Sequence, residues 1–214
     1  MNSEGLVVGI STAAAVEVAL LAADIDVAAA SDQGALESLA ALLKSALHER
    51  NRAIDDITLI GVCTGPGSFT GLRIGVAFAK SLAQTKNIPI VGVSAYDVAA
   101  FHVTSLPVVS VARGKRDYYY ARLTADRDRA PQFIAGSKSV IERAAADLGR
   151  PGEPATIAGP DFSTAQPGDA ARAVAQLACQ AQQSGLDLHW TNIAIDYGQR
   201  PNAVLNWEQR RRSG

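Results

Sequence analysis

Gly65-Pro66-Gly67-Ser68-Phe69-Thr70-Gly71-Leu72-Arg73 is the stretch that decides the fold. An apolar run at 59–63 precedes it and a helical pattern at 71–83 follows, which predicts a strand, a glycine-rich turn and a helix. A helix start of this kind can hold an anion on its free N–H groups. A tight turn that only needs its glycines for conformation explains the pattern equally well. Both interpretations stay open, and the candidate anion-binding residues are Gly65, Gly67, Ser68, Thr70, Gly71 and Arg73.

The spacing of this stretch excludes two common nucleotide motifs. A Walker A loop ends in Gly-Lys-Ser/Thr, but here Arg73 follows Leu72 and the next lysine is Lys80. The dinucleotide fingerprint has the spacing G-x-G-x-x-G, and the third glycine here comes one residue too late. Any phosphate chemistry at this turn would therefore follow another pattern.

Together with Ile74-Gly75-Val76-Ala77-Phe78-Ala79-Lys80-Ser81-Leu82-Ala83, the turn resembles the signature of the bacterial TsaB (YeaZ) family, over about residues 55–95. The resemblance implies a two-domain α/β fold of the actin/sugar kinase/Hsp70-like (ASKHA, ribonuclease H-like) type. We expect an N-terminal domain at 1–98 and a smaller C-terminal α/β domain at 99–214. The family implies a non-catalytic subunit in the synthesis of N6-threonylcarbamoyladenosine (t6A) in tRNA.

The same resemblance implies the partners. These are a catalytic TsaD-type subunit in a heterodimer, a TsaE-type ATPase, and a second copy of the chain when it is alone. It implies tRNA contact only through the complex and no cofactor, with ATP or ADP possible only at the interface with a partner. It also implies that the first two helices dock TsaD, and the corresponding residues here are Leu36, Leu39, Leu43, Ile74, Gly75, Phe78 and Leu82.

The helix at 71–83 is apolar on nearly all sides, which is typical of a helix buried on more than one side. Small residues recur every fourth position along it. This stripe predicts close approach by another helix, either 35–50 of the same chain or a helix of another chain; its members are Gly71, Gly75, Ala79 and Ala83.

Hydrophobic periodicity predicts the remaining elements. Strands at 6–10, 16–21 and 25–30 form an antiparallel meander, followed by a helix at 35–50, and a further strand falls at 88–93. A helix capped by Ser94 leads to a second sheet. Its strands are expected at 108–112, 118–124, 132–137 and 156–158, with helices at 140–148 and 170–184.

The residues that superfamily catalysis needs are missing. A phosphotransferase of this kind requires an acid after its first strand, but Ile10 is followed by Ser11-Thr12. The three histidines, His48, His102 and His189, are too far apart for a metal site like that of the catalytic relative. We therefore expect no catalytic and no metal-binding residues. The alternative is a nucleotide-dependent phosphotransferase that uses Gly65–Gly71 as a phosphate cradle.

Composition argues against several other classes. A net charge of −1 provides no basic footprint for tight nucleic-acid binding. Acidic residues interrupt the apolar N-terminal stretch, so we expect no signal peptide, no membrane span and a cytoplasmic location. Cys63 and Cys179 are expected as buried thiols. Basic residues around 113–122 flank three tyrosines that could stack on RNA, although a hairpin with one aromatic face in the core explains them as well.

Overall fold

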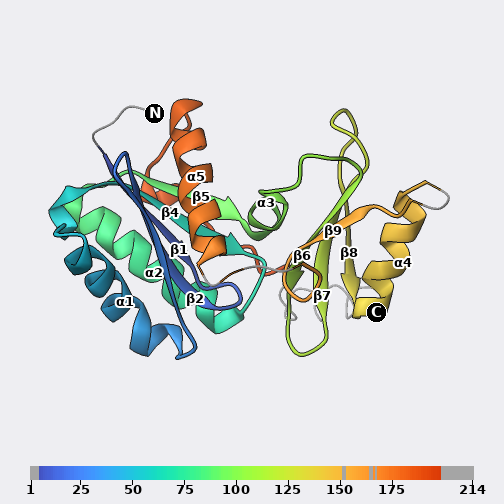
Figure 1. Cartoon of the computed structure of the whole chain (residues 1–214), viewed down its shortest axis with the longest axis horizontal. Helices are drawn as coiled ribbons and strands as arrows, with labels where there is room; N and C mark the ends of the chain where they lie inside the picture. Colours follow the sequence, from blue (N-terminus) through green and yellow to red (C-terminus); the bar gives the residue numbers. More distant parts are fainter. Residues whose placement is uncertain (1–4, 151–152, 164–165, 167, 199–214) are drawn as a thin grey trace, which may run out of the picture.

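A computed structural model of the chain describes residues 5–150, 153–163, 166 and 168–198 (Figure 1). It contains two mixed sheets with helices between and outside them, as the actin-like fold class requires. Among these described residues, no helix combines the length and the hydropathy that crossing a bilayer demands.

The first sheet has the strand order β3-β2-β1-β4-β5. β1 (Leu6–Ser11), β2 (Val16–Ala22) and β3 (Ile25–Ser31) form the predicted antiparallel meander. β4 (Ile57–Gly65) and β5 (Ile90–Ser94) then add in parallel, β4 beside β1 and β5 beside β4. The near-continuous apolar sequence of β1 and β4 follows from burial on both faces.

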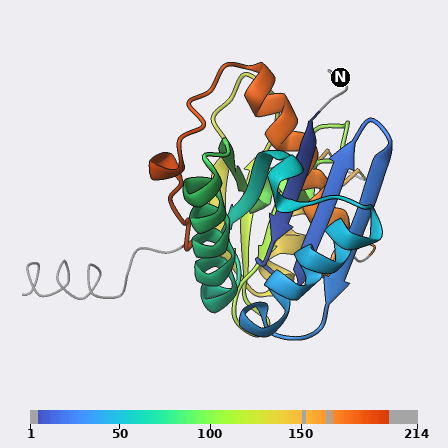
Figure 2. The ribbon, with the colours of Figure 1, turned by 90° about the vertical axis from the view of Figure 1, so that its left-hand side faces the viewer.

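Helices cover both faces of the first sheet. α1 (Ala35–Glu49) and α2 (Phe69–Lys86) lie together on one face, and α5 (Asp169–Gln183) lies on the other (Figures 1 and 2). The short helix α3 (Ala95–Ala100) lies between this half and the second sheet (Figure 1). A 3-10 turn, Ile54–Asp56, precedes β4.

The second sheet has the order β8-β7-β6-β9. Its strands are β6 (Val108–Arg113), β7 (Tyr119–Thr124), β8 (Gln132–Gly136) and β9 (Thr156–Ala158). α4 (Lys138–Leu148) covers its outer face (Figure 1). The predicted elements are therefore present, and only their ends differ, by a few residues at most.

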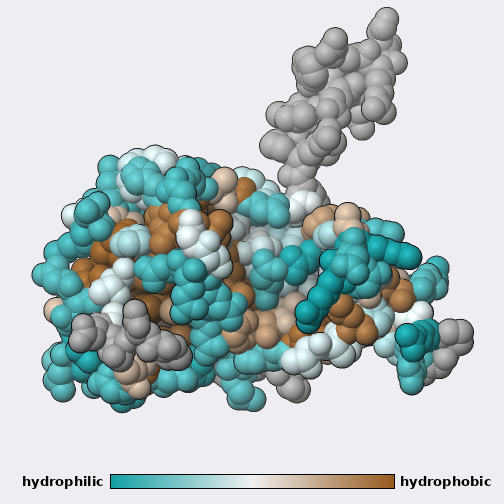
Figure 3. Space-filling model, turned by 90° about the horizontal axis from the view of Figure 1, so that it is seen from above, coloured by the Kyte–Doolittle hydropathy of each residue, from teal (hydrophilic) through white to brown (hydrophobic). Residues whose placement is uncertain are grey.

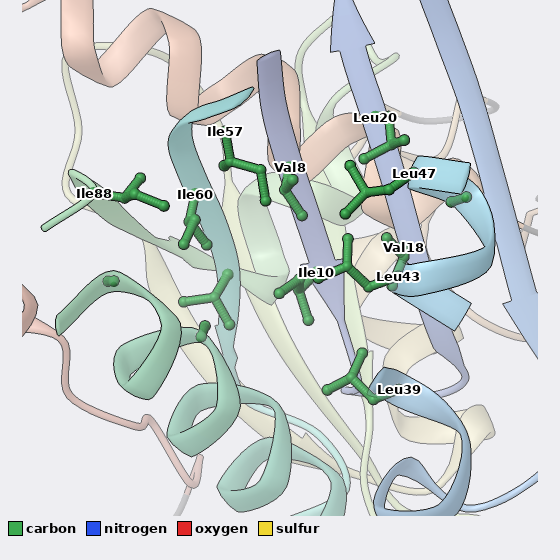
Figure 4. Packing of buried hydrophobic residues seen from close by; sticks show 14 of the residues in the cluster. Val8, Ile10, Val18, Leu20, Leu39, Leu43, Leu47, Ile57, Ile60 and Ile88 are labelled. Atoms are coloured by element: carbon green, nitrogen blue, oxygen red, sulfur yellow. The ribbon is translucent and has the colours of Figure 1, made fainter. Parts of the chain in front are cut away.

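The core falls into three apolar clusters. The largest lies between the first sheet and α1 with α2, where Leu39, Leu43 and Leu47 point from α1 toward Val18 and Ile10 (Figure 4). The second lies between that sheet, α3 and α5, and the third under α4. α5 follows the second sheet in the chain but packs on the first. A boundary near residue 98 therefore remains a proposal, because α5 comes after that boundary in the sequence and packs on the first sheet.

Candidate functional site

The glycine-rich turn joins β4 to α2, as predicted. β4 ends at Gly65, whose φ of 103° suits a residue without a Cβ. Ser68 is the N-cap of α2, and its hydroxyl accepts a hydrogen bond from the Gly71 N–H at 3.2 Å. The Gly71 N–H is therefore already bonded within the turn.

The glycines of the turn allow close contact with the segment that follows β1. A Cβ on Gly67 would lie 2.6 Å from the Ala13 carbonyl oxygen, and one on Gly71 would meet the Thr12 carbonyl oxygen. The Ser68 N–H donates to Ala13 O at 2.7 Å. The absence of side chains at Gly67 and Gly71 thus makes room for the backbone after β1, and the Ser68 N–H is bonded to that same backbone. This geometry favours the tight-turn interpretation over the phosphate cradle.

Thr70 and Arg73, the other two candidate anion-binding residues, are exposed at the start of α2. The Arg73 guanidinium carbon lies 5.4 Å from the centroid of the Phe69 ring, and that ring lies 5.0 Å from the Tyr197 ring. The Arg73 guanidinium therefore lies against an aromatic side chain at the start of α2.

A buried acid lies on the strand that follows β1, and the sequence analysis did not select it as a site residue. Glu17 on β2 is only 8% exposed, and its carboxylate accepts a hydrogen bond from the Ala171 N–H at 3.1 Å, in the first turn of α5. Burial raises the pKa of Glu17, although hydrogen bonds from the N–H groups of Ala171, Gly168 and Ala170 act in the opposite direction. The sequence signal that could have identified Glu17 is its position as the one charged residue in the otherwise apolar strand β2.

A cleft of about 510 Å³ opens between the two halves of the molecule. Its lining comes from the segment after β1, from α3, from the first turns of α5 and from the strands of the second sheet. Glu17 and Cys63 belong to this lining. Burial raises the pKa of the Cys63 thiol to about 11, so that this group is a neutral thiol at physiological pH.

The expected docking residues separate into two groups. Leu39 and Leu43 are 1% and 2% exposed and face the sheet, so they stabilise this chain and are not available to a partner (Figure 4). Leu36 is 76% exposed. Three residues of α2 are half-buried at the edge of the same core, namely Ile74, Phe78 and Leu82.

The small-residue stripe has a different role from the one expected. Gly75, Ala79 and Ala83 are buried in this chain. A Cβ on Gly75 would meet the Thr12 side chain, with Cγ2 at 3.0 Å. At Gly75 the stripe therefore lets α2 approach the end of β1, and at this position the close neighbour is not a helix. The four-residue period of small side chains predicted that another segment packs closely against α2, but it did not identify that segment.

A segment near the C-terminal end of the described chain covers one flank of α2, which the sequence analysis did not anticipate. Leu188 O accepts from the Ile90 N–H at 3.0 Å, and the Asp196 N–H donates to Thr64 O at 2.9 Å. Between these two points, Lys80 Nζ donates to Ile193 O at 3.1 Å. We call residues 188–196 the strap. Its conformation is fixed by contacts between residues that are about 100 or more positions apart in the sequence, which local sequence patterns do not record.

The basic and aromatic hairpin is largely structural. Tyr119 and Tyr120 are 4% and 9% exposed, on opposite faces of β7, and Tyr118 is 38% exposed. Arg113 pairs with Asp161 at 3.3 Å, and Arg122 pairs with Asp97 at 2.7 Å. The tyrosines therefore serve the core more than a stacking surface. The sequence also contains three consecutive arginines, Arg210, Arg211 and Arg212, which lie outside the described residues.

The histidines and acids form no metal site within the described part of the chain, where no cluster of three or more His, Cys, Asp or Glu has suitable geometry. His48 is in the last turn of α1, and His102 and His189 are exposed. Both cysteines are free thiols; Cys63 is buried as expected and Cys179 is half-buried.

Comparison with known proteins connects this geometry to a family. The model of the family described as "TsaD: tRNA N6-adenosine threonylcarbamoyltransferase" matches residues 29–188. The tRNA threonylcarbamoyladenosine biosynthesis protein TsaB of Bacillus subtilis is 41% identical over 76 residues, which cover 33% of each chain. The tRNA N6-adenosine threonylcarbamoyltransferase of Clostridium novyi is 44% identical over 59 residues, 28% of this chain and 17% of that one.

These alignments span a third or less of the curated relatives' own length. The structural match is more extensive. YeaZ from Pseudomonas aeruginosa superimposes with a TM-score of 0.68 at 18% identity, covering 90% of this chain and 99% of that one. At this identity the superposition demonstrates a shared fold. The family model matches residues 29–188, which is most of the chain, so the chain belongs to the TsaD-like family that this model describes.

Proposed function

We propose that this protein is a non-catalytic scaffold subunit in the synthesis of t6A in tRNA, and that it activates a TsaD-type catalytic subunit by binding it. Family membership supports the pathway. The absence of an acid after β1 supports a role without phosphoryl transfer, because Ser11 cannot hold a divalent cation as a carboxylate does.

The observation that carries the docking part of this proposal is the outer edge of α2. Ile74, Phe78 and Leu82 are half-buried over the largest core cluster, so each still presents apolar surface to solvent. Seen from above in Figure 3, hydrophobic residues gather mainly on the half of the molecule that carries the first sheet, bordered by hydrophilic ones. Because Ile74, Phe78 and Leu82 recur every fourth residue, they lie on one side of α2, and apolar side chains that stay partly exposed together are typical of a protein interface.

The proposed docking surface is therefore narrower than the set inferred from the sequence. It consists of Ile74, Phe78 and Leu82 on α2 together with the exposed Leu36 on α1. Leu39, Leu43 and Gly75 act indirectly, because they hold α1 and α2 against the sheet. The same surface would hold a second copy of the chain when TsaD is absent.

The other expected partners follow from the same proposal. A TsaE-type ATPase would join the complex formed with TsaD. ATP or ADP would bind only where a partner completes a site, and tRNA would reach this chain only through the complex. Since tRNA is modified in the cytoplasm, we expect the protein there.

Measuring the affinity of the full chain for the TsaD-type protein of the same organism tests the docking surface. Phe78→Glu places a charge on the proposed surface and should weaken binding by at least about a hundredfold, since an unpaired charge is buried in the interface. Val140→Glu is the matched control, because Val140 is an apolar residue, 45% exposed, on α4 of the other half. Equal affinity of Phe78→Glu and the unchanged protein would refute this surface.

A further inference from the structure

The cleft between the two halves has the size and lining of a small-molecule site. At about 510 Å³ it lies within the range usual for ligand pockets, about 300–1,000 Å³. Most of its wall is apolar and made of short side chains, including Ala13, Ala15, Ala95, Val98 and Ala99. Such a wall excludes little volume and offers dispersion contacts to the body of a ligand.

The cleft also has polar lining residues, and three of them are buried. Ser11, Glu17 and Cys63 line it and are 4%, 8% and 1% exposed. Ser11 carries no charge and the Cys63 thiol is neutral, so Glu17 is the one ionisable group among these three that can be charged at physiological pH. The Glu17 carboxylate accepts from the Ala171 N–H, and the N–H groups of Gly168 and Ala170 also act on it, but a carboxylate has about four acceptor positions.

The arrangement is unfavourable for a phosphate. The N-terminus of α5, which borders the cleft, is the place where a helix would bind an anion, and the carboxylate of Glu17 already lies there. Asp32 and Asp169 also line the cleft, whereas its one arginine, Arg113, is paired with Asp161. His102, which is exposed, also lines the cleft. A phosphate would therefore face three carboxylates, with Arg113 already engaged and His102 at an exposed position.

We propose that this cleft binds a small, largely apolar molecule that carries an amine, with the amine directed at Glu17. The ammonium group would donate to the carboxylate oxygens left free by α5, in a partly desolvated place where charge-assisted hydrogen bonds are strong. The apolar body would lie against the alanine-rich wall. This inference concerns a site separate from the proposed docking surface, because none of Ile74, Phe78, Leu82 and Leu36 lines the cleft.

The test is a titration of the full chain with small-molecule probes. Binding is monitored by the chemical shifts of the backbone amide signals in nitrogen-15 NMR spectra. The probes are benzylamine, benzyl alcohol, benzoate and ATP. Benzylamine should shift the signals of cleft residues such as Ala15, Ala99 and Ala112 at millimolar concentration. Benzyl alcohol should bind more weakly, and benzoate and ATP should leave these signals unchanged. A cleft that prefers benzoate or ATP, or that benzylamine leaves unchanged, would overturn the proposal.

Two variants separate the charge from the cavity. Glu17→Gln keeps an acceptor for α5 but removes the charge, so benzylamine affinity should fall about tenfold while benzyl alcohol affinity stays the same. Ala99→Phe fills part of the cleft and should weaken both probes alike, which also covers the case in which Glu17→Gln does not fold. Unchanged benzylamine affinity in a folded Glu17→Gln protein, or in Ala99→Phe, would contradict the assignment.

Discussion

The Glu17 carboxylate accepts a hydrogen bond from the Ala171 backbone N–H at 3.1 Å, which connects β2 to the first turn of α5 across 154 residues of sequence. A negatively charged side chain at a helix N-terminus interacts favourably with the helix dipole. The same position removes the carboxylate from water, because Glu17 is only 8% exposed, and this loss of hydration is unfavourable. The balance between these effects makes Glu17 a sensitive point of the fold.

The stability of the protein should depend on pH through Glu17. Burial raises its folded-state pKa above the ordinary carboxyl value, so the folded state binds the proton more tightly than the unfolded state. The contribution of Glu17 to the free energy of unfolding is therefore greatest below the ordinary carboxyl pKa and declines as pH rises through the raised pKa. Glu17→Gln, which does not titrate, removes this decline.

Urea denaturation at several pH values checks this. The free energy of unfolding of Glu17→Gln minus that of the unchanged protein should increase as pH rises from acid to neutral. Glu37→Gln, which changes an exposed glutamate in the first turn of α1, is the control and should show no such increase. A difference for Glu17→Gln that decreases with pH would mean that the bonds to α5 outweigh burial.

Gly75→Ala should destabilise the protein although alanine favours helices. The new Cβ would meet the Thr12 side chain, and overpacking of this kind costs about 1–3 kcal/mol. Thr12→Ala removes the obstructing atoms, and Thr12 Oγ1 is a buried atom without a hydrogen-bond partner among the described residues. The double variant should therefore be more stable than Gly75→Ala alone. A double-mutant cycle with zero coupling energy would contradict this packing.

Lys80→Met should loosen the strap. Lys80 Nζ donates to Ile193 O and lies 5.8 Å from the centroid of the Trp190 ring. Losing both interactions should lower the free energy of unfolding by about 1–2 kcal/mol and speed amide exchange at 188–196. Lys86→Met on the same helix is the control, because the ion pair of Lys86 with Asp55 is largely exposed and of little energetic value. Equal effects of the two changes would contradict a specific role for Lys80.

Thiol reactivity should differ between the two cysteines. Alkylation requires the thiolate, and Cys63 combines 1% exposure with a pKa of about 11. Burial also raises the pKa of Cys179, but its side chain is half-buried, so Cys179 should react first with iodoacetamide at mildly alkaline pH. Peptide mass spectrometry over time measures the order. Rapid labelling of Cys63 in the folded protein would contradict this order and would show that the reagent reaches the Cys63 thiol through the cleft.

Much of the fold was predictable because its signals are local. The apolar runs of β1 and β4 and the leucine spacing of α1 each report the burial of a single element. The turn at Gly65–Gly71 was likewise recognisable, since glycines and a capping Ser68 act over a few residues.

The site was predictable only in part, because it depends on contacts between distant segments. The sequence indicated that another segment lies close to Gly75. That segment is Thr12, the residue directly after β1, and not a helix. Glu17 was noted only as an interruption of an apolar run, since its partner Ala171 is far along the chain. Leu39 and Leu43 were included among the docking residues because the family resemblance implied the whole helix, and the sequence does not say which of its leucines meet the sheet.

The most direct test of the scaffold account is a reconstituted assay of threonylcarbamoyl transfer to tRNA. The TsaD-type and TsaE-type proteins of the same organism are supplied with and without this chain, and t6A is measured by mass spectrometry of the digested tRNA. The account predicts that t6A forms only when the chain is present and that Phe78→Glu behaves as if the chain were missing. Equal t6A formation without the chain would contradict the scaffold role.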